Sequence, residues 1–270
     1  MALGIRGPAL LALLEFVAFS GILPASVAAG LMAVCGLALV DSPPPGLLAT
    51  AMALGVAGTL VIYTLDRLRD LQRDRATAPA RSAFVKLHRE ALTALSVASA
   101  GACLPLAAML PSSTWWACGF ALALGLFHRR LKSSHRFFSV LYVTLAWLAV
   151  VLGIPAATFS GELDSPLGVA IAASALGPSI AANLIASDLR GHPLDPETHR
   201  RLRLGSWIAL AGCLGPLVAS DFRPLIAIPL AVWASLAGFR SSELYGLLVL
   251  DGALLLGALI AVGLLVLGGG

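Results

Sequence analysis

The sequence predicts an all-α, polytopic membrane protein, and three observations lead to that fold class. Hydrophobic residues make up 59% of the 270 residues, and the mean hydropathy is +0.91. Charged residues make up only 12%, whereas a soluble domain carries about 25%. Apolar runs long enough to cross a bilayer as helices, about 20 residues each, recur along the chain. We therefore expect a single transmembrane domain over residues 1–270.

Nine apolar stretches, bounded by charges, prolines and glycines, are expected to form the transmembrane helices. They are residues 8–40, 46–65, 88–110, 113–128, 137–158, 166–187, 203–220, 224–239 and 244–268. The first stretch is long and is expected to bend near Pro24. The shorter stretches suit helices with little tilt, or helices whose ends are covered by neighbours.

The basic residues predict the orientation of these helices. With the N-terminus in the cytoplasm, seventeen of the eighteen Lys and Arg residues fall in cytoplasmic segments, and Arg223 is the exception. Cytoplasmic loops of membrane proteins carry such an excess of positive charge. We therefore expect a cytoplasmic N-terminus, an external C-terminus and a location in a bacterial inner (cell) membrane. The net charge of +4 has the same explanation, so membrane lipids are expected partners and nucleic acid is not.

Three aspartates follow the second apolar stretch at intervals of four residues. At this spacing Asp66, Asp70 and Asp74 lie on one face of a helix, within about 12 Å along its axis. Carboxylates this close repel one another unless a cation joins them, and Mg²⁺ takes oxygen ligands that it shares with phosphates. The alternative is a solvated helix end, at which the aspartates pair with the neighbouring arginines Arg67, Arg69, Arg73 and Arg75.

A second polar cluster, NLIASDLRGHPLD, closes the sixth stretch on the same predicted side of the membrane. It contains Asn183, Asp188, His192 and Asp195. Ionisable residues are costly inside a membrane and less so near its interface. Two groups of carboxylates at equivalent helix ends therefore favour a shared cavity.

Basic residues between the two clusters supply the charge that phosphate oxygens bind. The segment FHRRLKSSHR, after the fourth stretch, contains Arg130 and Lys132, although a plain cytoplasmic loop would contain them as well. Glu15 and Asp251 fall inside predicted spans, where they could line a cavity, pair with each other or reach the interface. Together, the carboxylates and the basic loop predict a diphosphate site that contains a metal ion.

At these residues the chain resembles the UbiA superfamily of intramembrane prenyltransferases, of the 4-hydroxybenzoate polyprenyltransferase type. Members of that family have nine transmembrane helices and two Asp-rich motifs, after helices two and six. Against the first motif, N-D-x-x-D-x-x-x-D, Asp66 occupies the Asn position and Arg67 the next, while Asp70 and Asp74 fit the last two. The resemblance implies a UbiA-like helical bundle.

The second motif of the family, D-x-x-D-x-x-x-D, is degenerate in this chain. Asp188 and Asp195 fit its two ends, and Gly191 takes the middle position. Downstream of the first motif, Thr77 and Arg81 are similar to a Thr and an Arg that the family often has.

The resemblance implies Mg²⁺-dependent transfer of a prenyl group from a polyprenyl diphosphate to an aromatic or other lipophilic acceptor within the membrane. The catalytic carboxylates implied in this way are Asp66, Asp70, Asp74, Asp188 and Asp195, of which Asp70, Asp74 and Asp188 are the metal ligands. The substrate-binding residues implied are Arg81, Arg130, Lys132, Asn183 and His192.

Two other functions fit parts of the sequence. A non-catalytic or transport-type membrane protein of the same fold would explain the degenerate second motif without any chemistry. A CDP-alcohol phosphatidyltransferase would require the segment D-G-x-x-A-R, whereas Asp66 is followed by Arg-Leu-Arg. The prenyltransferase is therefore the preferred hypothesis, and the transport-type protein is the alternative.

Overall fold

The computed structural model describes residues 8–132, 136–163 and 165–268, and these contain no β-strand. Within these ranges, the side chains of residues 8, 11, 73–77, 126–132, 136 and 137 are not described. The first half forms α1 (Pro8–Phe19), α2 (Ile22–Leu39), α3 (Pro45–Thr77), α4 (Pro79–Leu87), α5 (Arg89–Ala108) and α6 (Ser112–Lys132). The second half forms α7 (Arg136–Leu148), the π-helical turn η1 (Ala149–Gly153), α8 (Ile154–Thr158), α9 (Pro166–Ser187), α10 (Pro196–Ala211), α11 (Leu214–Val218), the 3-10 helix η2 (Ser220–Ile226), α12 (Ala227–Ala237), α13 (Glu243–Tyr245), the π-helical turn η3 (Gly246–Leu250) and α14 (Asp251–Gly268).

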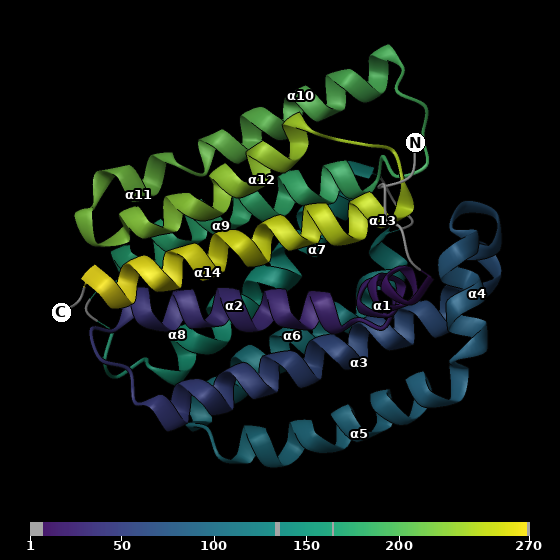
Figure 1. The fold of residues 1–270 in the computed structure, drawn as a ribbon. Helices are drawn as coiled ribbons and strands as arrows, with labels where there is room; N and C mark the ends of the chain where they lie inside the picture. The colour runs from purple at the N-terminus through teal and green to yellow at the C-terminus, as the bar shows by residue number, and fades with distance from the viewer. Residues whose placement is uncertain (1–7, 133–135, 164, 269–270) are drawn as a thin grey trace.

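The long helices lie side by side in a bundle, as Figure 1 shows for α2, α3, α9 and α14. At one end of the bundle lie α4, α13 and the start of α10, whereas α11 and the end of α14 lie at the opposite end. The segments that follow the second, sixth and eighth predicted spans therefore gather at a single end. This arrangement fits the predicted grouping of cytoplasmic segments, and which end faces the cytoplasm stays a prediction.

Six helical stretches of the described chain are long and apolar enough to cross a membrane. They are Ile22–Leu39, Pro45–Gln72, Arg89–Ala108, Phe138–Thr158, Pro166–Ser187 and Glu243–Gly268. Large hydrophobic side chains remain exposed on them, among them Val97 at 68%, Leu104 at 79% and Leu256 at 56%. Lipid acyl chains match such a surface and water does not. The chain therefore has the helices of a membrane protein, as its composition predicts.

The other three predicted spans are also helical, but they are not among these six stretches. Residues 113–128 lie in α6, residues 203–220 lie mainly in α10 and α11, and residues 224–239 lie mainly in α12. α10 has 16 residues and α12 has 11, so each is shorter than the roughly 20 residues of a typical span. The count of nine spans, like the UbiA-like arrangement, stays a prediction.

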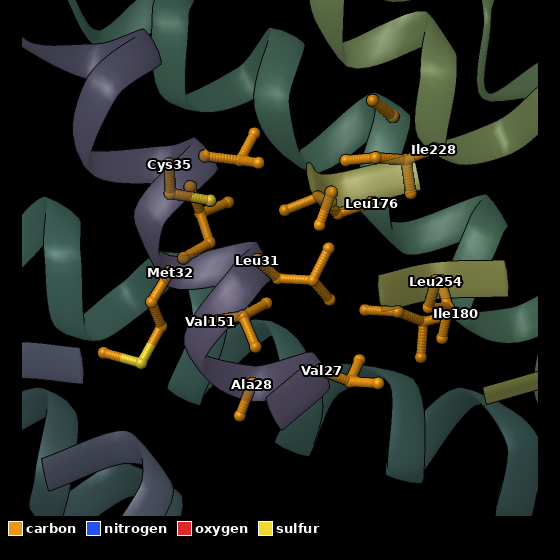
Figure 2. Close-up of a cluster of buried hydrophobic side chains, with 14 of the residues drawn as sticks. Val27, Ala28, Leu31, Met32, Cys35, Val151, Leu176, Ile180, Ile228 and Leu254 are labelled. Atoms are coloured by element: carbon orange, nitrogen blue, oxygen red, sulfur yellow. The ribbon is translucent and has the colours of Figure 1, made fainter. Parts of the chain in front are cut away.

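The apolar core of the bundle is centred on α2. Figure 2 shows Leu31 of α2 pointing toward Leu176 of α9 and Leu254 of α14, while Met32 points to the other side of α2; Val151 of η1 belongs to the same cluster. All five side chains are buried. Because lipid tails are as apolar as these side chains, close packing rather than transfer from water holds such helices together.

Glycines let α14 approach its neighbours closely. A Cβ atom on Gly257 of α14 would lie 2.6 Å from Cα of Ile228 on α12. A Cβ atom on Gly30 of α2 would lie 3.2 Å from Cδ1 of Leu255 on α14. Small residues at contacts of this kind are a common means of packing helices in membranes. The contacts fix α14 against α2 and α12, and so they fix the position of Asp251 at its start.

The helix break near the N-terminus lies at Gly21, which has a φ of +88°. Left-handed backbone of this kind favours glycine, because a side chain would be strained there. Pro24 lies in the first turn of α2, where proline is accommodated. The bend that the sequence predicts near Pro24 therefore occurs three residues earlier than expected.

Candidate polar site at one end of the bundle

The C-terminal part of α3 contains the first predicted motif. Asp66 is exposed and Asp70 is partly buried, while Arg67 between them is only 6% exposed. With 3.6 residues per turn, Asp70 points about 60° and Asp66 about 100° away from Arg67 around the helix axis. The two aspartates therefore lie on the flank of α3, and the arginine lies on the side that faces the bundle.

The guanidinium group of Arg67 caps the end of α1. Its Nη1 donates hydrogen bonds to the carbonyl oxygen of Ala18, at 3.3 Å, and to that of Phe19. The last carbonyls of a helix have no partner inside the helix, and a cation there also suits the helix dipole. Arg67 thus bonds to α1, and the interpretation in which it pairs with the aspartates is wrong for this residue.

An aromatic ring lies beside Arg67. The centroid of the Tyr63 ring, one turn earlier on α3, is 5.8 Å from Cζ of Arg67, which is a cation–π distance. The ring of Trp147 on α7 meets Tyr63 edge to face, with 6.2 Å between their centroids. The Tyr63 ring therefore covers one side of the guanidinium group, and Trp147 packs against that ring.

Asn183, which is buried, and Asp251, which is partly buried, form a hydrogen-bonded pair. Asn183 on α9 is 5% exposed, and its Nδ2 donates to Oδ1 of Asp251 over 3.0 Å. Asp251 is the first residue of α14 and directly follows η3. The Oδ1 atom of Asn183 is buried and has no hydrogen-bond partner among the described residues. Such an atom marks a place where a donor from a water or a ligand would fit.

Arg190 lies against η3 in the turn that follows α9. Its Nε donates to the carbonyl oxygen of Ser187 over 2.8 Å. Its aliphatic stem crosses Gly246, where a Cβ atom would lie 2.1 Å from Cδ of the arginine. The next residue, Gly191, has a φ of +75°, and its N–H donates to the carbonyl oxygen of Ser241. This turn is therefore tied to the segment that precedes α13.

The remaining residues of the second motif lie at the surface. Asp188 is exposed at the C-terminal end of α9. Asp195 is exposed and caps α10, because its Oδ1 accepts a hydrogen bond of 2.7 Å from the N–H of Thr198. This bond lowers the pKa of Asp195 below the ordinary value of 3.8. Gly191 stands at the middle position of the motif, and its left-handed backbone explains the glycine.

His192 is also exposed, at the rim of the same turn. Its Nδ1 lies 3.2 Å from the carbonyl oxygen of Arg190. The substrate contact predicted for His192 would therefore be made from the rim.

Arg81 joins this region from α4. Its backbone N–H donates to Oε1 of Glu243 on α13 over 3.3 Å. The charged groups that act on Arg67 are Arg81, Arg190 and Asp251. We use the term polar site for Arg67, Arg81, Asn183, Arg190 and Asp251. In this site, Arg67 and Arg190 act on the carboxylate of Asp251, and Arg81 acts on Arg67.

The predicted Mg²⁺ ligands can be compared with the structure only in part. The side chains of Asp74, Arg130 and Lys132 lie outside the described residues. Among the side chains that are described, no group of three or more His, Cys, Asp or Glu residues could hold a metal ion. Asp70 and Asp188 therefore do not form a metal site with a third described residue. The assignment of Mg²⁺ to Asp70, Asp74 and Asp188 stays a prediction.

The structure brings two of the predicted site residues, Arg81 and Asn183, into the polar site. Sequence reasoning missed the inward position of Arg67 and of Arg190, and it left several roles open for Asp251. Helical spacing contains a signal for Arg67, because it lies three residues after the buried Thr64 on the same face of α3. For Asp251 the structure selects a pair with Asn183, and not with Glu15.

Comparison with protein-family models, with curated proteins and with solved structures found no match to this chain. The resemblance to the UbiA superfamily therefore stays a hypothesis. The geometry of the polar site and the apolar helices around it are the observations from which a function can be argued.

Proposed function

We propose that the protein is a membrane-embedded prenyltransferase that moves a prenyl group from a polyprenyl diphosphate to an aromatic or other lipophilic acceptor. The observation that carries the proposal is the polar site, in which three guanidinium groups lie together in a bundle of apolar, membrane-length helices. A diphosphate with a long hydrocarbon tail matches both features, because guanidinium groups bind phosphate oxygens and apolar helices accept the tail.

The transfer breaks the bond between the allylic carbon of the prenyl group and the diphosphate oxygen, and the electron pair leaves with the diphosphate. The acceptor atom then bonds to that carbon, and the acceptor loses a proton. Negative charge that develops on the leaving group is stabilised by fixed cations aimed at it. The carbocation-like prenyl group must be kept away from water, and apolar helix walls provide such an environment.

In this proposal Arg81 contacts the diphosphate, and Asn183 lies beside it. His192, at the rim, would take the proton of the acceptor, because a neutral imidazole has a nitrogen that can accept one. The resemblance assigns Mg²⁺ to Asp70, Asp74 and Asp188. Guanidinium groups can supply the positive charge that stabilises the leaving diphosphate.

A non-catalytic or transport-type membrane protein is the second candidate. Two of the membrane-length stretches are interrupted by π-helical turns, and the turn η3 directly precedes the partly buried Asp251. Interrupted helices and buried carboxylates are typical of transporters. This candidate predicts movement of a solute and no cleavage of a diphosphate.

Thermal denaturation of the detergent-purified protein with geranylgeranyl diphosphate tests the first candidate. A ligand at 100 times its Kd adds about 2.7 kcal/mol to the stability of the folded state. Geranylgeraniol, which has the same tail and no diphosphate, is the matched control. Stabilisation by the diphosphate alone, together with diphosphate release when a set of phenolic acceptors is supplied, would support the proposal. Equal responses to both compounds, without release, would favour the second candidate.

A further inference from the structure

The geometry points to direct binding of the donor's diphosphate by Arg67, Arg81 and Arg190, with no metal ion between protein and phosphate. This inference rests on the proposed function and states how that site holds the charged end of its substrate. It differs from the carboxylate and Mg²⁺ arrangement that the resemblance implies. Four features of the polar site lead to it.

Three different elements deliver the guanidinium groups to one place. Arg67 comes from α3, Arg81 from α4 and Arg190 from the turn after α9. The backbone of Arg81 contacts Glu243, and the stem of Arg190 crosses Gly246, which lies three residues farther along the same segment. The charges of Arg81 and Arg190 both act on Arg67. Contacts between distant parts of the chain therefore bring these cations together.

The polar site and its edge hold more positive than negative charge. Three arginines meet two carboxylates, those of Asp251 and Glu243. Arginine stays protonated in proteins, so the excess cannot be removed by loss of a proton. Like charges repel strongly when they are removed from water. An anionic ligand, such as a diphosphate, offsets this repulsion.

Arg67 has donors that its structural role does not use. Both hydrogen bonds to α1 come from Nη1, so Nε and Nη2 take no part in them. A guanidinium group has five N–H donors in a planar fork, and this fork matches the oxygens of a phosphate. Arg67 can therefore cap α1 and contact a diphosphate at the same time.

Three of the five motif carboxylates are placed less favourably for the same task. Asp66, Asp188 and Asp195 are exposed, and Asp195 is occupied as the cap of α10. Asp70 is partly buried, and the side chain of Asp74 lies outside the described residues. No described group of three potential ligands could hold a metal ion. The polar site, by contrast, contains guanidinium groups, which bind phosphate oxygens.

Equilibrium binding of radiolabelled geranylgeranyl diphosphate to the full-length protein in excess EDTA tests this inference. We expect saturable binding in EDTA, competition by inorganic pyrophosphate and no competition by geranylgeraniol. Arg81→Gln and Arg190→Gln should each weaken binding by about tenfold or more, because each removes a charged donor. Gly246→Ala should also weaken it, since the new Cβ displaces the stem of Arg190 without any change of charge. Arg69→Gln, an exposed arginine on α3, is the matched control and should bind as the wild type does.

The outcomes separate the inference from the proposed function. Binding that requires MgCl₂ and disappears in EDTA overturns the inference and leaves the prenyltransferase proposal intact. Absence of binding with and without MgCl₂ removes both. Wild-type affinity in Arg81→Gln and Arg190→Gln also overturns the inference. The test relies on these two residues because neither of them holds the end of α1, so their loss leaves that cap in place.

Discussion

The end of α3 and the turn between α9 and α10 both place an arginine inward and aspartates outward, but they do so with different backbones. α3 continues as one helix of 33 residues, so Arg67 and the aspartates beside it point in directions fixed by the helix. α9 ends at Ser187, and the chain turns at Gly191 with a φ of +75°. The position of Arg190 therefore depends on this turn and on the space above Gly246.

This difference teaches which arginine supports the fold and which one depends on it. Arg67 is bonded to the end of α1, so its loss removes a contact between α1 and α3. Among the described residues, the side chain of Arg190 donates a hydrogen bond to the nearby Ser187, within its own turn, so its loss changes the polar site more than the bundle. We therefore expect the loss of Arg67 to lower stability more than the loss of Arg190 does.

Replacement of Arg67 should cause the largest loss of stability, because it removes the hydrogen bonds between α3 and the end of α1. Arg67→Ala leaves the carbonyls of Ala18 and Phe19 without their donor, and each buried group that loses its partner costs about 1–3 kcal/mol. The midpoint of thermal denaturation in detergent should fall clearly, and α1 should become more sensitive to protease. Arg69→Ala, an exposed position on the same helix, should have little effect. An unchanged midpoint in Arg67→Ala would contradict the capping role.

The next largest loss of stability should come from removal of the hydrogen bond between Asn183 and Asp251, because this bond joins α9 to α14. Either Asn183→Leu or Asp251→Leu should destabilise the protein by about 1–3 kcal/mol, since each leaves the other side chain without its hydrogen-bond partner. The double variant should lose less than the sum of the two single variants. Chemical denaturation of the four proteins measures this coupling, which is about 0.5–3 kcal/mol for residues in contact. Strict additivity would show that the hydrogen bond contributes nothing.

The turn after α9 should respond to a methyl group at Gly191. Gly191→Ala places a side chain at a φ of +75°, and left-handed backbone costs an L-residue about 1–2 kcal/mol. Gly119 on α6, where an added Cβ meets no atom within 4 Å, provides the control, because alanine is a better helix former than glycine. Thermal denaturation should show a loss for Gly191→Ala and none for Gly119→Ala. Equal effects at both positions would mean that the turn is not restrained.

The smallest effect should come from the cap of α10, and it depends on pH. The hydrogen bond from Thr198 lowers the pKa of Asp195, so this contribution to stability is present above the ordinary value of 3.8 and is lost as the pH falls through the lowered pKa. Asp195→Ala should therefore be slightly less stable than the wild type near neutral pH, and the difference should shrink in acid. Asp188→Ala, which removes no cap, should show no such loss. A difference that grows toward low pH would have the wrong sign for this explanation.

Much of the fold followed from the sequence, because the length and hydropathy of apolar runs are local properties. The membership of Arg81 and Asn183 in a polar region was also predictable, from their positions beside charge-rich helix ends. The inward direction of Arg67 depends on which face of α3 the bundle buries, and spacing alone does not decide between faces. Arg190 depends on Gly246, a residue from another part of the chain, so no local pattern predicts its place.

The cap on α1 also constrains the order in which the chain assembles during synthesis. The carbonyl groups of Ala18 and Phe19 precede their donor on Arg67 by 49 and 48 residues. They therefore emerge from the ribosome before that donor has been made. Buried carbonyl groups without a partner are costly. We therefore expect α1 to settle only after the α3 segment has been made.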